Sequence, residues 1–518
     1  MLTSKLRQLR KNHLDRLWPT HRGSPRGGSS REPLLLQRLV RIRGYLAIFA
    51  IALGLQTYKI TVPSLWWDEA ATKASFVNGW AGIDAITLHL DVVHKLFYQL
   101  MYLNTQVFGL SALSLRLPGA VATSLACVLL VKLAKELGIT GVGAYFAGLF
   151  LAILPRVTWA SLESRSYAID VFTGVLAALI LVLALKHGAS RWAWLWWAGY
   201  GAAMTFATYL YMYQVLLLIA HAIFLWARRS PRRTWFFWGA EALVVLSLAI
   251  PLVLTAKSQQ QQVAWIQFDP RQAPGLFVSQ SYPHDPITPW IVWVIVLGFG
   301  IFNWRRRSDQ GGKATWLASA WLFAPTLSLM LVSVVATPIY NSRYLSFTAG
   351  GFALLVASVI FKNQRKWWVA ALVLALLVSL TGHEYFKQRR PQSFGADWAQ
   401  AAQALESAAH KGDAVIFTDS RRYPVRRVSV MAAAYPEAFK NLSDVTARPN
   451  PNHLFGDRVL WSGLGKGLGG YKAVWVIEDH RIDAGELVRA QQFLTSLGFH
   501  LETTQTLRYT SMYRYAKN

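Results

Sequence analysis

Acidic residues are scarce in this sequence, which has 26 Asp and Glu against 53 Lys and Arg, so the position of each acid is informative. Two of them, Asp68 and Glu69, are adjacent and directly follow Trp66 and Trp67. A solvated loop with tryptophan anchors would account for such a pair. Paired carboxylates can also take a proton from a reacting group or hold a divalent cation. We therefore take Asp68 and Glu69 as the first candidates for chemistry.

Further ionisable side chains occur at the ends of long apolar stretches. They are Asp91 with His94, Glu163 with Arg165 and Tyr167, and Tyr340 with Arg343. Ionisable groups in the first turns of a membrane helix are expensive, and they are usually paired or functional. A Glu163–Arg165 pair at the membrane interface would be a structural alternative. Arg165 and Arg343 could instead clamp a phosphate, because a guanidinium group meets phosphate oxygens in a bidentate geometry.

Membrane helices must position these residues. With 53% hydrophobic and 15% charged residues, the 518-residue chain is too apolar for an ordinary soluble protein. Stretches of roughly 17 to 24 apolar residues can cross about 30 Å of hydrocarbon. We predict eleven such spans, at 44–61, 117–136, 141–157, 166–186, 192–209, 211–227, 234–255, 287–303, 315–336, 343–361 and 367–384.

The net charge of +27 indicates cytoplasmic loops of a membrane protein rather than a nucleic-acid partner. Alternate connections between the spans are basic, as in Arg228–Arg233 and Arg305–Arg307, which places the N-terminus inside. Counting residues 94–110 as a twelfth span would put these clusters outside. We therefore interpret 62–115 as an external loop with amphipathic helices along the membrane surface. The connections at 158–165, 256–286 and 337–342 then lie on the same side.

The sequence divides into three parts. Residues 1–43 are predicted to form a basic, disordered cytoplasmic tail, because they combine eleven Lys and Arg with Gly-Ser-Pro stretches. Residues 44–385 form the transmembrane domain. Residues 386–518 are predicted to form a small extracytoplasmic α/β domain, with strands near 414–417 and 473–477. The expected fold class is an α-helical polytopic membrane protein with a small C-terminal α/β domain.

Five motifs occur in a characteristic order and on one predicted side of the membrane. They are Trp67–Ala70, Asp91–Tyr98, Leu115–Pro118, Glu163–Tyr167 and Pro338–Tyr344. Together they resemble glycosyltransferase family 39, which has the GT-C fold and includes the protein O-mannosyltransferases and aminoarabinose transferases. The resemblance covers roughly residues 40–350, and it looks closest to actinobacterial mannosyltransferases that build cell-envelope glycans.

The resemblance implies an inverting enzyme of the plasma membrane with an extracytoplasmic active site. Its partners would be the bilayer, a polyprenyl monophosphate donor, with mannose the expected sugar, and a glycan, lipid or protein acceptor. Asp68 would act as base toward the acceptor hydroxyl group, with Glu69 in a supporting role. Arg165, Arg343 and Tyr340 would lie near the donor phosphate. The further supporting residues are Asp91, His94, Glu163 and Tyr167.

Several alternatives stay open on the sequence. Many family members have a His-Pro-Pro element where this chain has His94, Lys95 and Leu96. No organic cofactor is implied, and a divalent cation would be held by Asp68 and Glu69. A polyprenyl-pyrophosphate-dependent ligase or oligosaccharyltransferase would share the predicted topology. A lipid-linked-sugar transporter would be expected to show inverted repeats, which we do not find.

Overall fold

The computed structural model describes residues 34–305, 312–361, 366–419, 427–448, 455, 457–459, 464–481 and 484–517. The chain separates into two compact units, Met1–Leu46 and Ala47–Asn518, and the candidate site lies wholly in the second. Most of the predicted basic tail, residues 1–33, lies outside the described residues. The first helix, α2 (Leu34–Thr57), begins nine residues before the predicted end of that tail. The run of leucines at 34–36 is a good helix former, which extends the helix in this direction.

All eleven apolar stretches are helical, and the mostly helical fold is confirmed. After α2 the helices are α6 (Ala112–Glu136), α7 (Val142–Ile153) with α8 (Pro155–Ala160), α9 (Tyr167–Lys186), α10 (Ala193–Leu210), η2 (Met212–Leu216) with α11 (Leu217–Ala227), α12 (Arg232–Ser258), α14 (Thr288–Arg305), α15 (Gly312–Val335), η5 (Ser342–Thr348) with α16 (Ala349–Ile360), and α17 (Trp367–Lys387). In the described part of the chain, six helices are long and apolar enough to cross a membrane. They are α6, α9, α12, α15, η5 with α16, and α17.

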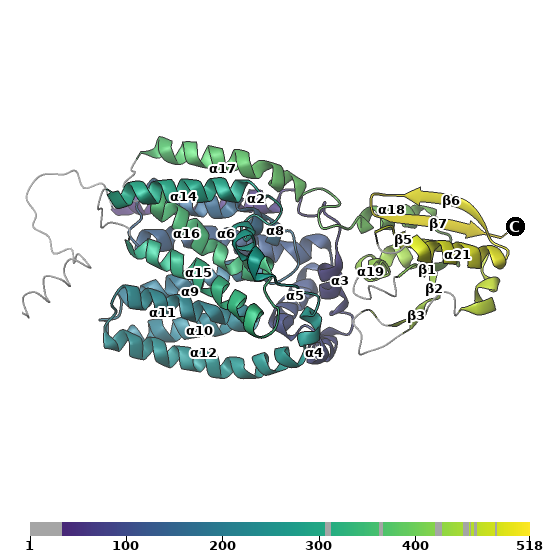
Figure 1. Ribbon diagram of the computed structural model, residues 1–518, viewed down its shortest axis with the longest axis horizontal. Coiled ribbons are helices and arrows are strands. Elements are labelled where there is room, and N and C mark those ends of the chain that lie inside the picture. The colour runs from purple at the N-terminus through teal and green to yellow at the C-terminus, as the bar shows by residue number, and fades with distance from the viewer. Residues whose placement is uncertain are drawn as a thin grey trace, which may run out of the picture. The chain divides into compact units, whose positions relative to one another are not determined.

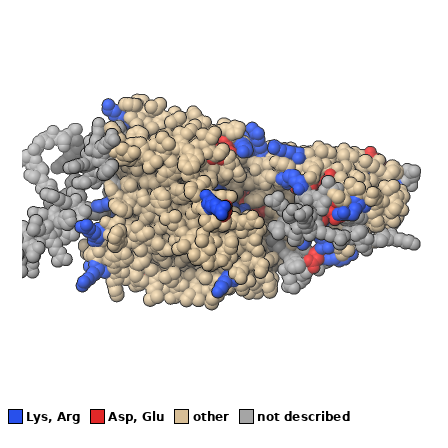
Figure 2. All heavy atoms as spheres, in the orientation of Figure 1, with Lys and Arg blue, Asp and Glu red and all other residues tan. Residues whose placement is uncertain are grey.

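The helices pack side by side in a bundle, with α6 on α9, α9 on α10, and α15 on both α11 and α16 (Figure 1). On the face drawn in Figure 2, a broad uncharged surface covers these helices. Such a surface suits lipid, so the protein is a multi-pass membrane protein.

The predicted external loop contains four short helices rather than a twelfth span. They are α3 (Trp67–Ala74), α4 (Gly79–His89), η1 (Val92–His94) and α5 (Lys95–Phe108). The 14 residues of α5 are too few to cross the hydrocarbon layer, which takes about 20. Val107 and Phe108 at its end are 74% and 72% exposed, as expected for a helix that contacts lipid at the membrane surface. The loop ends at a capping box formed by Ser111 and Ser114, which begins α6.

A second long connection follows α12. It contains η3 (Gln260–Val263), η4 (Pro270–Gln272) and α13 (Ala273–Ser279).

The C-terminal region has a five-stranded sheet in the order β2-β1-β5-β7-β6. Its elements are α18 (Trp398–Ala408), β1 (Ala414–Phe417), α19 (Val430–Ala434), α20 (Pro436–Phe439), β2 (Ser443–Asp444), β5 (Ala473–Asp479), α21 (Ala484–Ser496), β6 (His500–Thr506) and β7 (Thr510–Ala516), beside a small hairpin of β3 (Ala447–Arg448) with β4 (Asp457–Arg458) and a turn at η7 (Gly465–Gly470). β1 is parallel to β2 and β5, whereas β7 is antiparallel to β5 and β6. Both predicted strands, β1 and β5, are completely buried.

Candidate active site

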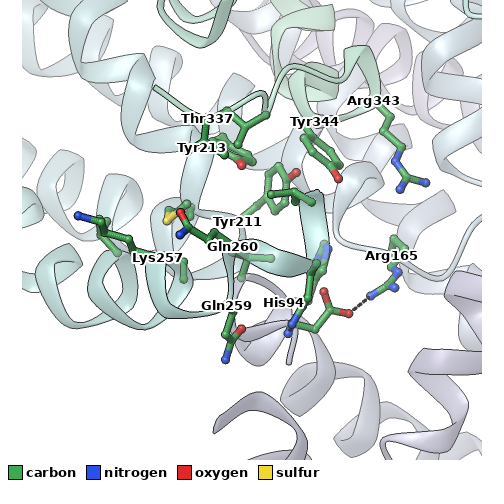
Figure 3. Close-up of a pocket in the computed structure, with 18 of the residues that line it drawn as sticks. His94, Arg165, Tyr211, Tyr213, Lys257, Gln259, Gln260, Thr337, Arg343 and Tyr344 are labelled. Atoms are coloured by element: carbon green, nitrogen blue, oxygen red, sulfur yellow. Dashed lines mark hydrogen bonds and ion pairs between the residues drawn. The ribbon is translucent and has the colours of Figure 1, made fainter. Parts of the chain in front are cut away.

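The ends of several helices surround one cavity of about 450 Å³ (Figure 3). Its lining comes from segments far apart in the sequence: α3 and η1, the start of α9, the turn after α10, the end of α12 with η3, and the connection from α15 to η5. These are the connections that the charge pattern assigned to one side. They do meet at a single end of the helix bundle.

Asp68 lies in the first turn of α3, where the helix N-terminus favours a carboxylate. Its Oδ2 accepts a hydrogen bond from Arg343 Nη1 at 2.9 Å, and its Oδ1 lies 3.4 Å from Arg165 Nη2. The Asp68 side chain is 21% exposed and lines the cavity. One carboxylate is thus held between two guanidinium groups and remains accessible.

Arg165 has further partners on its other side. Its Nη1 lies 3.0 Å from Asp91 Oδ2 and 2.5 Å from the hydroxyl oxygen of Tyr98, which in turn donates to Asp91 at 2.6 Å. Asp91 has a left-handed backbone with φ of 58°. Two glutamines after α12 hold this turn, because Gln262 accepts from the Asp91 amide and Gln259 from that of Val92, at 3.1 and 3.0 Å. Sequence reasoning missed Tyr98, Gln259 and Gln262.

Arg343 lies at the start of η5, where the Asn341 side chain accepts a hydrogen bond from its amide at 3.2 Å. Four aromatic rings surround the guanidinium group at 5.6 to 6.0 Å, namely those of Trp66, Tyr167, Trp265 and Tyr344. Such rings stabilise a cation without using its N–H donors. Within the described residues, the buried Nε of Arg343 has no hydrogen-bond partner.

Close packing against α15 fixes η5. Trp321 Nε1 donates to the carbonyl of Phe347 at 3.1 Å. A Cβ added at Gly350 or Gly351 would come within 2.7 and 2.9 Å of the Trp321 ring, so only glycine lets α16 approach this closely. The chain segment that carries Arg343 is therefore held by a rigid contact.

Electrostatics keep both cavity carboxylates ionised. Burial alone would raise the pKa of Asp68, but the charges of Arg343 and Arg165 outweigh it and lower the pKa below its ordinary value. The same balance, with Arg165 as the main opposing charge, lowers the pKa of Asp91. Burial and the charge of Arg165 lower the pKa of His94 to about 4, so its ring is neutral near pH 7. It stacks on Tyr211 with centroids 5.4 Å apart.

Glu163, two residues before Arg165, is 2% exposed. Burial, and then the negative charge of Asp68, raise the pKa of Glu163 well above its ordinary value. Neither carboxyl oxygen has a hydrogen-bond partner among the described residues, so the suggested Glu163–Arg165 pair does not form. Glu163 does not line the cavity, whereas Tyr167 does.

Glu69 points away from the cavity. Its carboxylate is completely buried and receives two hydrogen bonds from Arg116, at 2.7 and 2.6 Å. Arg116 also donates to the carbonyl groups of Ile60 and Pro63, and the amide of Ser164 donates to Glu69 at 3.1 Å. Glu69 thus joins α3, α6 and the segment before α9. Arg116 lies in one of the quoted motifs, but its partner could not be identified from the sequence.

Tyr340 is buried, and its hydroxyl group reaches Gln280 Oε1 only at 3.4 Å. It does not line the cavity, whereas Tyr344, four residues later, does. Lys257 at the end of α12 also lines the cavity and was not predicted.

The two carboxylates of the sequence pair do not converge on a common point, because Asp68 faces arginines of the cavity and Glu69 is bound to Arg116. The described residues contain no group of three or more His, Cys, Asp or Glu side chains that could hold a metal ion. What the site offers is a carboxylate that can accept a proton and two guanidinium groups that can hold an anion.

Comparisons with known proteins concern the fold and one part of the chain. Residues 96–254 match the family model described as dolichyl-phosphate-mannose-protein mannosyltransferase. The crystal structure of ArnT from Cupriavidus metallidurans in the apo state gives a TM-score of 0.54 at 11% identity, covering 92% of this chain and 98% of that chain. The structure of the same protein bound to undecaprenyl phosphate gives 0.53 at 11% identity, with coverages of 93% and 98%.

The Archaeoglobus fulgidus oligosaccharyltransferase, in complex with Zn and sulfate, has a TM-score of 0.47 at 11% identity over 91% of this chain and 73% of that chain. No curated protein matches this sequence. The family match covers the segment from α5 to α12, and this segment contains Arg165. The ArnT-like fold covers nearly the whole chain. The chain therefore has an ArnT-like fold, and residues 96–254 are similar to the mannosyltransferase family.

Proposed function

We propose that the protein transfers a sugar, with mannose the first candidate, from a polyprenyl monophosphate to a hydroxyl group of an extracytoplasmic glycan, lipid or protein. Transfer proceeds with inversion, and Asp68 is the base. The observation that carries the proposal is the position of Asp68 on the cavity wall, 2.9 Å from Arg343 and 3.4 Å from Arg165.

The cavity matches the two chemical halves of such a donor. Figure 3 shows Arg165 and Arg343 on one side of the cavity and Lys257 on the other. Val253 on α12 and Val332 on α15 also line it, and the two residues are 43% and 39% exposed. An anionic headgroup would lie between the arginines, while an apolar chain would leave between these helices into lipid.

The names of the similar proteins support the donor class. The family model that matches residues 96–254 is named after dolichyl phosphate mannose, and the ArnT structure with the same fold was solved with undecaprenyl phosphate. Both compounds are lipid monophosphates. Mannose is taken from the family name, and the monophosphate from both.

In the proposed reaction, Arg343 exchanges partners when the donor binds. Its N–H donors turn from Asp68 to the phosphate, so Asp68 loses part of the positive charge that lowers its pKa and becomes a stronger base. The acceptor oxygen then bonds to the anomeric carbon while the bond from that carbon to the phosphate oxygen breaks. The hydroxyl proton moves to Asp68, and the electron pair leaves with the phosphate, which Arg165 and Arg343 stabilise.

The test is transfer by the purified protein in liposomes. Polyprenyl phosphate mannose is supplied with simple hydroxyl acceptors, and the anomeric configuration of the product is read by NMR. We expect an inverted product with the monophosphate donor. A product of retained configuration would contradict the proposal. Turnover with a polyprenyl pyrophosphate donor and none with the monophosphate would also contradict it, and would favour the ligase alternative.

The extracytoplasmic location of the site is tested by cysteine labelling. The only cysteine, Cys127, is fully buried, so the wild type gives a low background. Val77 in the loop with Asp68 is 79% exposed, whereas Ala189 lies between α9 and α10, at their other end. With an impermeant thiol reagent added to intact cells, Val77→Cys should react and Ala189→Cys should not. The reverse pattern would place the site in the cytoplasm.

A further inference from the structure

The short helix that carries Asp68, α3, is in direct contact with the C-terminal domain. The hydroxyl group of Tyr435 accepts a hydrogen bond from the Leu65 amide at 2.7 Å, just before α3 begins. Lys73, in the last turn of α3, donates to the carbonyl of Ala434 at 2.8 Å. Ala434 and Tyr435, at the end of α19, thus form hydrogen bonds at both ends of α3.

Apolar contacts continue across the same boundary. Leu65 and Ala70 are 4% and 0% exposed, and they belong to the same buried cluster as Trp398, Met431 and Trp475 of the C-terminal domain. α19 packs directly on α3. One face of the sheet therefore completes its core with residues from the first external loop.

Two further contacts fix the chain that leads into α3. The Ser64 amide donates to the Pro391 carbonyl at 2.9 Å, and the Ser64 hydroxyl accepts from the Ala399 amide at 3.2 Å. Trp66 stacks on Phe394 with centroids 5.6 Å apart and an interplanar angle of 15°. All of these contacts lie in the segment that immediately precedes Asp68.

The opposite side of α3 is tied to the helix bundle. Glu69 binds Arg116, and Thr72 donates to the Ser164 carbonyl at 2.9 Å, next to Arg165. Asp68 lies between these two attachments and faces the cavity. An eight-residue helix has little stability of its own, so its position depends on what it packs against.

We propose that the C-terminal domain positions the helix of Asp68, with Tyr435 and Lys73 as positioning residues for transfer. This rests on the proposed function only in that Asp68 is taken as the base. The domain is then a structural part of the active site rather than a separable module. A displacement of about 1 Å at a catalytic group can cost about a hundredfold in rate, so small losses of support become visible in turnover.

The first experiment uses two phenylalanine variants of the full chain. Tyr435→Phe removes the hydroxyl group and keeps the ring. Tyr471→Phe is the matched control, because Tyr471 packs in the other apolar cluster of the same domain. We expect kcat of Tyr435→Phe to fall about three- to tenfold, which corresponds to the loss of one hydrogen bond. Donor KM and the unfolding temperature should stay near those of Tyr471→Phe.

The second pair of variants concerns Lys73. Lys73→Met removes the donor to Ala434 and keeps an apolar stem, and Lys73→Arg restores a donor. Lys73→Met should lower kcat without a matching change in donor KM, and Lys73→Arg should recover most of the loss. A merely structural role would lower the yield of active protein and leave kcat per folded molecule unchanged, which would overturn the proposal.

Hydrogen exchange gives a readout that does not need transfer. Amides of residues 64–74 should exchange faster in Tyr435→Phe than in Tyr471→Phe, while amides of α6 stay unchanged. Equal exchange in the two variants would overturn the positioning role even if transfer is observed. Faster exchange in a protein that shows no transfer from the lipid monophosphate would uphold the positioning of α3 and contradict the proposed function instead.

Discussion

The two carboxylates at the start of α3 are neighbours in sequence and have opposite surroundings. Glu69 and Arg116 are both 0% exposed and bind each other and neighbouring backbone groups, whereas Asp68 contacts two arginines and lines the cavity. A buried ion pair with every donor used can only hold structure. A carboxylate held between two arginines at the edge of water can exchange partners. Access to the cavity, rather than charge, distinguishes Asp68, the proposed base, from Glu69.

The largest effect is expected for the accessible carboxylate. Asp68→Asn removes the base and keeps the shape, so transfer should fall by roughly 10²–10⁴-fold or more. The unfolding temperature in detergent should hardly change, because the group is partly solvated. Turnover is measured with saturating donor. Near-normal transfer by a well-folded Asp68→Asn protein would show that Asp68 is not the base.

The enclosed carboxylate should respond in the opposite way. Glu69→Gln leaves Arg116 as an uncompensated buried charge, which typically costs about 3–5 kcal/mol of stability. Yield and unfolding temperature should therefore drop strongly. The protein that remains folded should lose less turnover than Asp68→Asn does. If Glu69→Gln were as stable as the wild type and as inactive as Asp68→Asn, the contrast between the two carboxylates would be lost.

Variants of Arg343 test anion binding more clearly than variants of Arg165, because Arg165 also binds Asp91 and Tyr98. Arg343→Ala should raise donor KM about thirtyfold or more, since removing one partner of a desolvated charge pair costs about 2–5 kcal/mol. Arg343→Lys should raise it less, because lysine keeps the charge and loses the bidentate fork.

The same variant gives a pH test. The charge of Arg343 contributes to lowering the pKa of Asp68, so its removal should move the acid limb of kcat/KM to higher pH. Acceptor KM is the control and should change little. An unchanged donor KM in both Arg343 variants would remove this residue from the phosphate site.

The smallest effect concerns His94, which is neutral in the folded protein. Its folded pKa of about 4 lies below the ordinary value of 6.5, so the unfolded chain binds more protons between these values and stability falls as the pH falls through them. This contribution amounts to roughly 1 kcal/mol between about pH 7.5 and 5.5. His94→Gln should remove it, which would be seen as a smaller drop in unfolding temperature. An equal drop in both proteins would mean that His94 carries a proton in the fold.

Most of the bundle could be predicted, because apolar runs long enough to cross lipid leave few alternatives to a helix. Charge alternation kept α5 out of the list of spans, and within the described residues α5 is not among the helices long and apolar enough to cross a membrane. The direction in which each side chain points could not be predicted from apolar runs and charge alternation. Successive residues on a helix point about 100° apart, and the sequence does not reveal which of Asp68 and Glu69 faces inward. The sequence also did not reveal that Tyr344, within η5, lines the cavity whereas Tyr340, just before η5, does not.

Arg116 gave a signal that was not used. It is an ionisable residue near the start of α6, and such a residue requires a partner. In the C-terminal domain, the completely buried strands β1 and β5 were recognised, but β6 was not. Its side chains are almost all exposed, so its composition is that of a polar loop. Its place in the sheet is set by pairing with β7.

The size of the cavity bears on how the enzyme would select its lipid. About 450 Å³ is room for a molecule of headgroup size and far too little for a long polyprenyl chain. All but the first part of the polyprenyl chain would remain in the bilayer, where its length would not be recognised by the cavity. Selectivity would then rest on the sugar and the phosphate, and one enzyme would serve lipid carriers of different lengths.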